Sequence, residues 1–266
     1  MREILPEEHK RILLEILIEF DRICRLNDIE YSLAFGTLLG AVRHHGFIPW
    51  DDDIDVIVTR ENYEKLQRIF NNQSNPKYEF VCVEMTKGFS APLGKIIDNS
   101  TLLIQNGHYS DKKEMGIYID VFPYDKVPED YKKRQKVFKK AVTRQKVWSF
   151  CGNNFGEHNA FVRIIRSAIN KTNLATIIAR NTNKWASKVS SNSSIFANLI
   201  FGQIKKETSV MKNSDIHKLK EYTFEEYRFW GIEAYDYYLT QWYGDYMSIP
   251  PINERVSCHD VKVYEK

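Results

Sequence analysis

The sequence lacks the features of a membrane-spanning or secreted protein. No apolar run approaches the roughly 18 residues that a bilayer-spanning helix needs. The amino-terminal residues lack the apolar stretch of a secretory signal peptide. The four cysteines are far apart and form no Cys-x-x-Cys pair, which argues against structural zinc and disulfides. These absences together predict a cytoplasmic protein.

Charge is unevenly distributed along the chain, although the net charge is only +3. Residues 1–125 contain 14 Lys/Arg and 21 Asp/Glu, whereas residues 126–190 contain 15 Lys/Arg and 3 Asp/Glu. The basic segment favours an anionic partner: the inner membrane surface, a polyanionic glycan or a phosphorylated lipid. A solvated helix face explains it as well. Nucleic acid is not expected, because the interleaved aromatic and basic residues of a single-strand channel are missing.

Two parts of the basic segment are candidates for peripheral association with the inner face of the cell membrane. Residues 132–146 combine eight Lys/Arg with only a modest apolar stripe, which predicts reversible electrostatic docking. Arg163, Arg166 and Lys171 lie among apolar residues and predict a shallow apolar contact with the membrane.

The most informative stretch is the acidic run Trp50-Asp51-Asp52-Asp53-Ile54-Asp55. Four carboxylates in five positions repel one another, and no fold needs them for stability. Asp53 and Asp55 precede the apolar run 56–58, which predicts a buried strand. Residues two apart on a strand point to the same face, so both carboxylates are expected to face one cleft. A divalent cation there would offset their repulsion.

A glycine-flanked turn, 35–40, lies shortly before the acidic run. Gly36 and Thr37 suit a close approach of backbone N–H groups to a phosphate at a helix start. Together with the carboxylate pair, the turn predicts metal-dependent transfer from a nucleotide, with Mg²⁺ as cofactor and Mn²⁺ as the alternative. A solvated loop that caps the next helix would explain Asp51 and Asp52, but not a pair that leads into a strand.

Asp120 is the third candidate carboxylate. It lies between Ile119 and Val121 on a predicted strand, where an acid is costly to bury unless it is paired or bound to metal. Phosphoryl transferases commonly gather carboxylates from neighbouring strands. Asp53, Asp55 and Asp120 are therefore predicted as catalytic residues and metal ligands. The alternative is a strand-end aspartate whose oxygens accept hydrogen bonds from backbone amides.

Three further residues are predicted to contact the substrate. Arg43, between the glycines and the aspartates, is placed to pair bidentately with a phosphate, or else to form an ion pair with Asp51 or Asp52. Lys95, at the start of an apolar strand, is a second candidate phosphate contact, or else a surface lysine. Asp51 is expected to position water or the acceptor hydroxyl.

The order of predicted elements indicates an α+β fold. The elements are helix 7–27, strand 31–35, helix 37–44, strand 53–58, helix 59–70, strands 78–84, 94–97, 101–104 and 116–122, and helices 129–150, 161–179 and 224–238. Residues 1–125 are expected to form a mixed-sheet catalytic core. Residues 126–266 are expected to be mostly helical, to complete the core and to present the acceptor- or membrane-facing surface.

Residues 35–55 (FGTLLGAVRHHGFIPWDDDID) resemble the signature of the LicD/fukutin family of nucleotidyltransferase-fold proteins. The resemblance is continuous over this stretch, which makes it far more specific than an isolated Asp-x-Asp. Further pieces that resemble the family are Lys95-Ile96, 118–123 (YIDVFP), 242–246 (WYGDY) and Pro250-Pro251.

The resemblance implies a nucleotidyltransferase-like fold and a phosphotransferase. Its donor would be CDP-activated, with phosphocholine from CDP-choline as the leading group. Its acceptor would be a sugar hydroxyl of a lipid-linked teichoic-acid, lipopolysaccharide or capsule precursor. The alternatives are CDP-ribitol or CDP-glycerol as donor, a plain nucleotidyltransferase acting on a small acceptor, and an inert scaffold. The scaffold is disfavoured because it would not need mutually repelling acids.

Aromatic residues are dense between positions 235 and 246. Aromatic faces attract a quaternary ammonium group such as that of choline, although core packing explains such a cluster as simply. The members are Tyr235, Tyr237, Tyr238, Trp242, Tyr243 and Tyr246.

Overall fold

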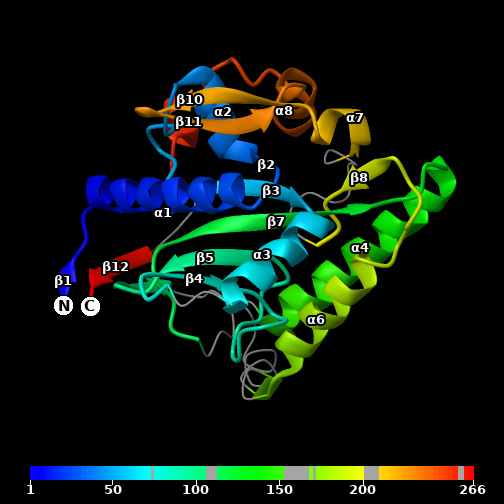
Figure 1. The fold of residues 1–266 in the computed structure, drawn as a ribbon, viewed down its shortest axis with the longest axis horizontal. Coiled ribbons are helices and arrows are strands. Elements are labelled where there is room, and N and C mark those ends of the chain that lie inside the picture. Colours follow the sequence, from blue (N-terminus) through cyan, green and yellow to red (C-terminus); the bar gives the residue numbers. More distant parts are fainter. Residues whose placement is uncertain (73–74, 106–112, 153–167, 170–171, 201–209, 257–260) are drawn as a thin grey trace.

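The computed structural model describes residues 1–72, 75–105, 113–152, 168–169, 172–200, 210–256 and 261–266. In these ranges the chain forms a mixed sheet with helices packed around it, which confirms the predicted α+β class (Figure 1). Among the helices of these ranges, none combines the length and the apolarity that a bilayer crossing requires.

The central sheet contains the order β10–β11–β2–β3–β7–β5–β4. These strands are β10 (Leu219–Phe224), β11 (Tyr227–Ile232), β2 (Tyr31–Leu33), β3 (Asp55–Thr59), β7 (Tyr118–Lys126), β5 (Gly94–Asp98) and β4 (Tyr78–Val81). The pairs β11–β2 and β3–β7 are parallel, and the other neighbours are antiparallel. β8 (Ile195–Ala197) pairs with the end of β7 and with β9 (Met211–Lys212).

A smaller sheet joins the two ends of the chain. Its order is β1 (Arg2–Glu3), β12 (Val261–Glu265) and β6 (Thr101–Gln105), all antiparallel. The N and C labels of Figure 1 therefore lie beside each other. The backbone N–H of Ile4 extends this pairing by donating to the Val263 carbonyl at 2.8 Å.

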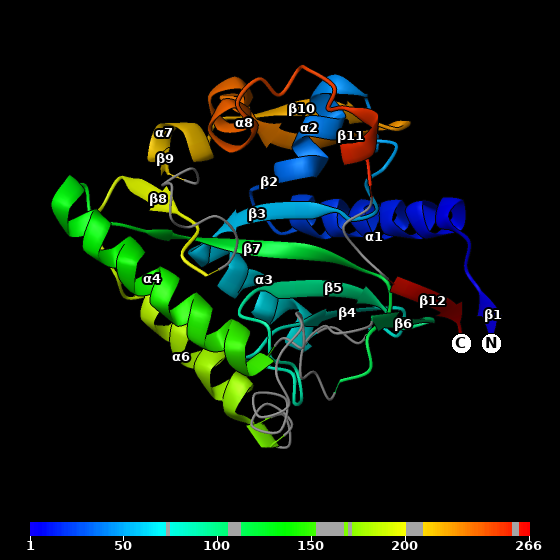
Figure 2. The ribbon, with the colours of Figure 1, turned by 180° about the vertical axis from the view of Figure 1, so that it is seen from behind.

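Helices α1 (Pro6–Leu26) and α3 (Arg60–Asn72) cover one side of the central sheet. They cross in front of the strands in Figure 1, and the strands lie in front of them in Figure 2. α1 adopts this position because Ile16, Leu17 and Phe20 recur at helical spacing, and all three are fully buried. Thr59 caps α3, because its hydroxyl accepts the Asn62 N–H at 3.4 Å.

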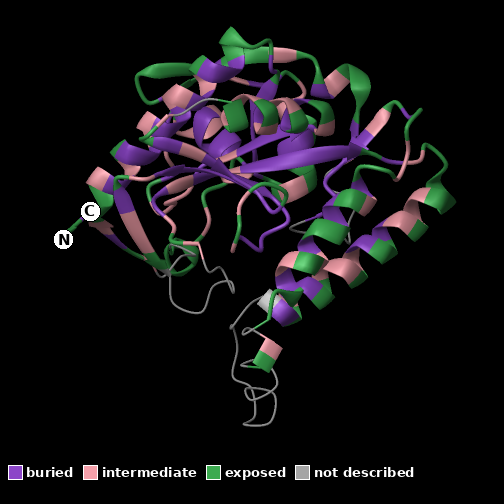
Figure 3. Cartoon of the chain, turned by 60° about the horizontal axis from the view of Figure 1, so that its bottom comes forward, coloured by how far each residue is buried: buried purple, intermediate pink, exposed green. Residues whose placement is uncertain are grey.

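Helices α4 (Tyr131–Gly152) and α6 (Leu174–Ala186) lie side by side at the end of the sheet. Figure 3 shows their outer faces as exposed, whereas the strands at the centre are buried. Two hydrogen bonds to carbonyl oxygens of the segment after β4 hold the helix pair: Trp148 donates to Ser90 at 2.7 Å, and Arg180 donates to Val83 at 2.9 Å. The lysines of α4 between positions 132 and 146 are exposed.

A buried ion pair joins the ends of β3 and β7 to α6. Arg60 Nε and Nη2 donate to the two Asp125 carboxylate oxygens at 2.7 and 2.8 Å, and the two side chains are 14% and 1% exposed. Arg60 Nη2 also donates to the Asn183 side chain at 3.2 Å. Removing either charged partner would leave the other buried and unpaired, so the pair fixes α6 against the sheet.

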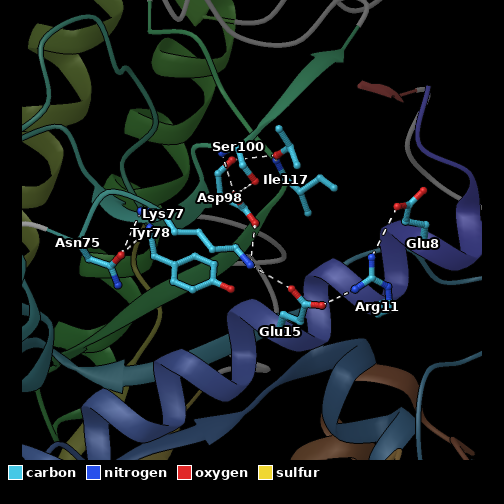
Figure 4. A network of polar contacts seen from close by, with 10 residues as sticks. Glu8, Arg11, Glu15, Asn75, Lys77, Tyr78, Asp98, Ser100 and Ile117 are labelled. Carbon is cyan, nitrogen blue, oxygen red and sulfur yellow. Dashed lines mark hydrogen bonds and ion pairs between the residues drawn. The ribbon is translucent and has the colours of Figure 1, made fainter. Parts of the chain in front are cut away.

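Figure 4 shows a second polar network, between α1 and the edge formed by β4 and β5. Lys77 donates to the Glu15 carboxylate at 3.1 Å and lies 3.8 Å from the carboxylate of Asp98. Asp98 is buried and also accepts the Ser100 N–H at 2.8 Å. The network satisfies a buried acid and ties α1 to the sheet edge.

The predicted elements of the first half of the chain are confirmed, with shifted ends. β7 differs most, because it continues through Pro123, where the strand was expected to stop. Backbone N–H groups alternate between the two sides of a strand. The Asp120 N–H faces β3, where it donates to the Ile54 carbonyl, so the nitrogen of Pro123, three residues later, faces β5. β5 pairs with β7 only as far as Val121, and the missing N–H of Pro123 therefore breaks no ladder.

The predicted helix over 224–238 is wrong. β10 and β11 form a hairpin there, and α8 (Tyr235–Tyr243) begins only after it. Side chains alternate along the hairpin, with Tyr222, Phe224 and Phe229 buried. Aromatic residues suit a half-buried sheet surface, and pairing with β2 prevailed over the helical pattern.

Two expectations stay predictions. Most of the helix predicted at 161–179, including Arg163, Arg166 and Lys171, lies outside the described residues. The division at residue 125 also stays a prediction, although β11 joins the sheet of the first half through the pairing of Gly231 with Leu33.

Candidate active site

A cavity of about 600 Å³, within the range typical of small-ligand sites, opens between α2 (Phe35–Arg43), the acidic run and the segment after α8. The carboxylates of Asp51, Asp53 and Asp55 line it, and so do Gly36 and Arg43. The other lining residues are Phe35, Leu39, Ile48, Trp50, Tyr243, Asp245, Tyr246, Ser248, Ile249, Pro250, Pro251, Glu254 and Val256. Five of the predicted site residues therefore meet at one cavity.

The start of β3 places two of the predicted catalytic acids. Asp53 precedes the strand and Asp55 is its first residue, so both reach the same cavity, as the spacing of two predicted. Asp120 is the direct neighbour of Asp55 in the parallel register of β3 and β7. Ile54 holds this register, because its carbonyl accepts the Asp120 N–H at 2.9 Å.

The carboxylates leave an excess of negative charge at the cavity. Burial raises the pKa of Asp55 well above its usual range, and the negative charges of Asp53, Asp120 and Asp51 raise it further. Lys95 opposes this effect only in part. Such crowding favours a bound cation or cationic group, which would offset the repulsion.

Lys95 is a buried partner of Asp120. Its ammonium group lies 2.5 Å from Asp120 Oδ1 and 3.4 Å from the centroid of the Tyr118 ring. The residue is only 3% exposed, so the alternative of a surface lysine is wrong. The charge and the aromatic face hold the ammonium group beside the acidic strands. Its predicted contact with a phosphate stays a prediction.

A divalent cation fits the donor chemistry of Asp53 and Asp55, because carboxylate oxygens are the ligands that Mg²⁺ and Mn²⁺ accept. Within the described ranges, no three His, Cys, Asp or Glu side chains converge closely enough to hold a metal ion alone. Mg²⁺ is commonly held by one or two carboxylates together with substrate phosphates. The three-carboxylate ligand set that includes Asp120 stays a prediction.

Gly36 allows Asp51 to lie against the start of α2. A Cβ atom at Gly36 would lie 2.5 Å from Asp51 Oδ2, closer than an ordinary contact. The start of a helix carries partial positive charge, which favours a carboxylate. Thr37 acts on the neighbouring acid: its buried hydroxyl accepts the Asp55 N–H at 2.8 Å. The glycine turn thus positions two carboxylates, and its predicted phosphate contact stays a prediction.

Phe35 begins α2 with a left-handed backbone, at φ 44°. Non-glycine residues rarely adopt this conformation, and it persists only where packing enforces it. The ring of Phe35 packs edge-on against Phe122 and Trp242, with centroids 5.1 and 4.7 Å away. The Phe35 N–H also lies 3.4 Å from the Tyr238 hydroxyl. These contacts fix the direction in which α2 enters the cavity.

Arg43 connects α2 to the segment after α8. Its Nη1 donates to the carbonyl oxygens of Tyr246 at 2.5 Å and Ser248 at 3.2 Å. Burial lowers the pKa of this guanidinium. Arg43 therefore holds one wall of the cavity in place, a role that its sequence position did not reveal. Its predicted phosphate contact stays a prediction.

The aromatic cluster divides into two groups. Tyr243 and Tyr246 line the cavity, together with Trp50 from the acidic run. Tyr238 and Trp242 pack behind it, with centroids 6.3 Å apart. The two remaining members do not line it: Tyr235 packs against Tyr222, and Tyr237 is exposed. The hydroxyl of Tyr243 lies in the field of the carboxylates: burial, then Asp55, Asp51 and Asp53, raise its pKa.

The segment 244–256 is the part of the site that elementary sequence patterns missed. Its Pro250-Pro251 pair and Glu254 form a wall of the cavity. Helical or strand periodicity gives no signal there, because only η2 (Ile252–Glu254) is regular. Only the family-like pieces WYGDY and Pro-Pro pointed to this segment.

Carboxylates at the start of β3, beside a glycine-containing helix start, are the arrangement expected of the nucleotidyltransferase class. Sequence comparison specifies the family: the profile described as "LicD/FKTN/FKRP, nucleotidyltransferase domain" matches residues 28–162. The chain belongs to this family, which confirms the resemblance noted at residues 35–55.

Individual relatives agree with this assignment. The lipopolysaccharide cholinephosphotransferase LicD of Haemophilus influenzae is 27% identical over 268 residues, which cover 99% of each chain. An uncharacterised protein of Rickettsia prowazekii is 29% identical over 119 residues, 45% of this chain and 41% of its own. An uncharacterised protein of Rickettsia typhi is 37% identical over 65 residues, which cover 24% of this chain and 21% of its own. The prediction of an enzyme that transfers a phosphate-linked group is confirmed at the level of the family.

Proposed function

We propose that this protein transfers phosphocholine from CDP-choline to a sugar hydroxyl of a cell-surface glycan, with a lipopolysaccharide precursor as the leading acceptor. The observation that carries the proposal is the cavity that carboxylates and aromatic rings line together. Full-length similarity to a lipopolysaccharide cholinephosphotransferase supports the same assignment. A teichoic-acid precursor would offer the same acceptor chemistry.

The cavity suits the two ends of the donor. A quaternary ammonium group cannot donate hydrogen bonds and is attracted by aromatic faces and negative charge. Tyr243 and Tyr246 supply the faces, and Glu254 supplies a carboxylate at the same cavity. The start of α2 and Arg43 lie at the same cavity and provide positive charge for the diphosphate.

In the proposed reaction, the sugar oxygen attacks the choline-bearing phosphorus of the donor in line with the diphosphate bridge. A bond forms between this oxygen and the phosphorus, and the bond from the phosphorus to the bridging oxygen breaks. CMP leaves with the bridging oxygen, and the hydroxyl proton passes to a carboxylate of the site. The buried ion pair with Lys95 holds Asp120 in a fixed position, next to Asp55 in the register of β3 and β7.

Asp53 and Asp55 would hold Mg²⁺ or Mn²⁺, with Asp120 as the third candidate ligand. When bound, the metal ion would offset the charge that develops on the diphosphate. The chain's own residues prepare this site in the absence of the ion: Thr37 fixes the backbone of Asp55, and Gly36 admits Asp51.

Product analysis tests the proposal. The protein is incubated with CDP-choline, Mg²⁺ and a glycan acceptor, and we expect CMP and a phosphocholine-modified sugar. Release of pyrophosphate would instead indicate transfer of a nucleotide. CDP-ribitol and CDP-glycerol serve as matched donors, because they share the diphosphate but lack the cation. Equal rates with all three donors would contradict choline recognition in this cavity. So would an equal rate of Tyr243→Ala and the wild type with CDP-choline.

A further inference from the structure

A second cavity, of about 400 Å³, lies beside the first and is large enough for a sugar ring. Its walls come from the junction of β1 and α1, from the segment 49–52 and from β12. Three elements far apart in the sequence therefore meet around it. The pairing of Ile4 with Val263, at 2.8 Å, closes the side formed by the chain ends.

Trp50 and Asp51 line both cavities. The two cavities are therefore neighbours, and they meet at the start of the acidic run. The segment between them is held in place by Lys10, whose ammonium group donates to the carbonyl of Pro49 at 3.1 Å. A transfer reaction needs two substrates that approach one phosphorus from opposite sides. Two cavities that share Trp50 and Asp51 would hold two substrates next to each other.

We propose that the second cavity binds the acceptor sugar, an inference that rests on the proposed transfer of phosphocholine. The sugar would lie against Trp50, with its reacting hydroxyl directed past Asp51 towards the donor.

The lining of the second cavity fits a neutral polyol better than a second nucleotide. Charges of both signs line it, with Glu3, Asp51 and Asp52 against Lys10 and Lys262, so no net positive field favours a polyanion. Sugar hydroxyls both donate and accept hydrogen bonds, and a mixed lining serves both roles.

His9 is the buried polar side chain of this cavity. It is 8% exposed and comes from the first turns of α1, which fixes its position. Ile4 and Val263, both buried, and the indole of Trp50 supply apolar surface for the C–H face of a sugar ring. The cavity thus combines a rigid polar group with an aromatic platform.

Saturation-transfer NMR with neutral methyl glycosides of glucose, galactose and N-acetylglucosamine tests the proposal. The variants His9→Leu and Lys262→Met alter the second cavity, and His9→Gln is a milder substitution if His9→Leu fails to fold. Two controls are matched to them: Glu254→Gln lies in the first cavity, and Lys266→Met removes a lysine just beyond β12 and outside the second cavity. Calorimetry with CDP-choline measures donor binding for each protein.

We expect at least one glycoside to receive saturation from the wild-type protein. The affinity of the protein for this glycoside should fall about 2- to 10-fold in the His9 and Lys262 variants, because one hydrogen bond contributes about that factor. It should be unchanged in both controls, and only Glu254→Gln should weaken CDP-choline binding. The proposal is overturned if no glycoside binds, or if Glu254→Gln abolishes glycoside binding while the His9 variants retain it. Failure of the proposed function gives a different result: glycosides bind, but CDP-choline does not.

Discussion

Replacing Gly36 with alanine should separate stability from activity. The added Cβ would lie 2.5 Å from Asp51 Oδ2, whereas an ordinary contact begins at 3.4 Å. The obstacle is the end of a side chain, so the Asp51 carboxylate can turn away without moving the backbone. We therefore expect the fold to tolerate the change and the site to lose its geometry.

The magnitudes follow from the same contact. The carboxylate must retreat by about 0.9 Å, and a displacement of about 1 Å in a catalytic site costs up to 100-fold in rate. Alanine is favoured over glycine by about 0.5–1 kcal/mol inside a helix, and Gly36 lies in the first turn of α2. For a chain of this length that corresponds to about 1–2 °C in Tm. Activity should thus fall while Tm stays constant or rises slightly.

A double-mutant cycle measures the coupling. CMP release gives kcat/KM for wild type, Gly36→Ala, Asp51→Ala and the double variant, and differential scanning fluorimetry gives Tm. Because the alanine acts only through the Asp51 carboxylate, Gly36→Ala should have no further effect in the Asp51→Ala background. Additive losses of activity, or a fall in Tm of several degrees, would refute the reasoning.

Four further predictions follow from the site and its supports. Asp53→Asn and Asp55→Asn should abolish CMP release without lowering the metal-free Tm, because each variant removes carboxylate repulsion. Excess EDTA should abolish the activity of the wild type, and turnover that persists in either variant would reject the metal assignment. Arg43→Ala should lower kcat/KM about 10- to 150-fold, because hydrogen bonds from charged donors contribute about 1.5–3 kcal/mol, and Arg43→Lys should lower it less. Near-normal kinetics of Arg43→Ala would show that the cavity wall does not need the guanidinium. Asp125→Ala should destabilise the fold by about 3–5 kcal/mol, measured by urea denaturation, because it leaves a buried guanidinium unpaired; a loss below 1 kcal/mol would contradict this. The lysines of α4 should bind the protein to anionic but not to neutral liposomes in sedimentation, with release as salt rises towards roughly 0.5 M, whereas equal binding to both vesicle types would reject electrostatic docking.

Local patterns in the sequence were sufficient for the acidic half of the site. The spacing of two between Asp53 and Asp55 and the apolar run behind them placed both carboxylates at one cavity. The alternating residues around Asp120 gave a strand, and the parallel register of β3 and β7 then brought Asp120 beside Asp55. These inferences needed only short-range periodicity.

Long-range pairing could not be predicted in the same way. The partners of Arg43 are carbonyl oxygens of Tyr246 and Ser248, and backbone groups leave no trace in a sequence. The burial of Lys95 depends on the Tyr118 ring and on Asp120, which reach it only through the pairing of β5 and β7. The hairpin of β10 and β11 was missed because its aromatic residues also fit a helical spacing.

The link between Arg43 and Tyr246 spans 203 positions of the chain. At a synthesis rate of about 5–20 residues per second, roughly 10–40 s pass on the ribosome between the addition of these two residues. During that interval the nascent chain has its repelling carboxylates but lacks the wall that Arg43 holds. Once residue 126 has been added, the strands β2, β3, β5 and β7 are available to pair, whereas the cavity is not yet formed. Appearance of donor binding in stalled nascent chains would therefore report the arrival of residues 243–256 rather than the formation of the core.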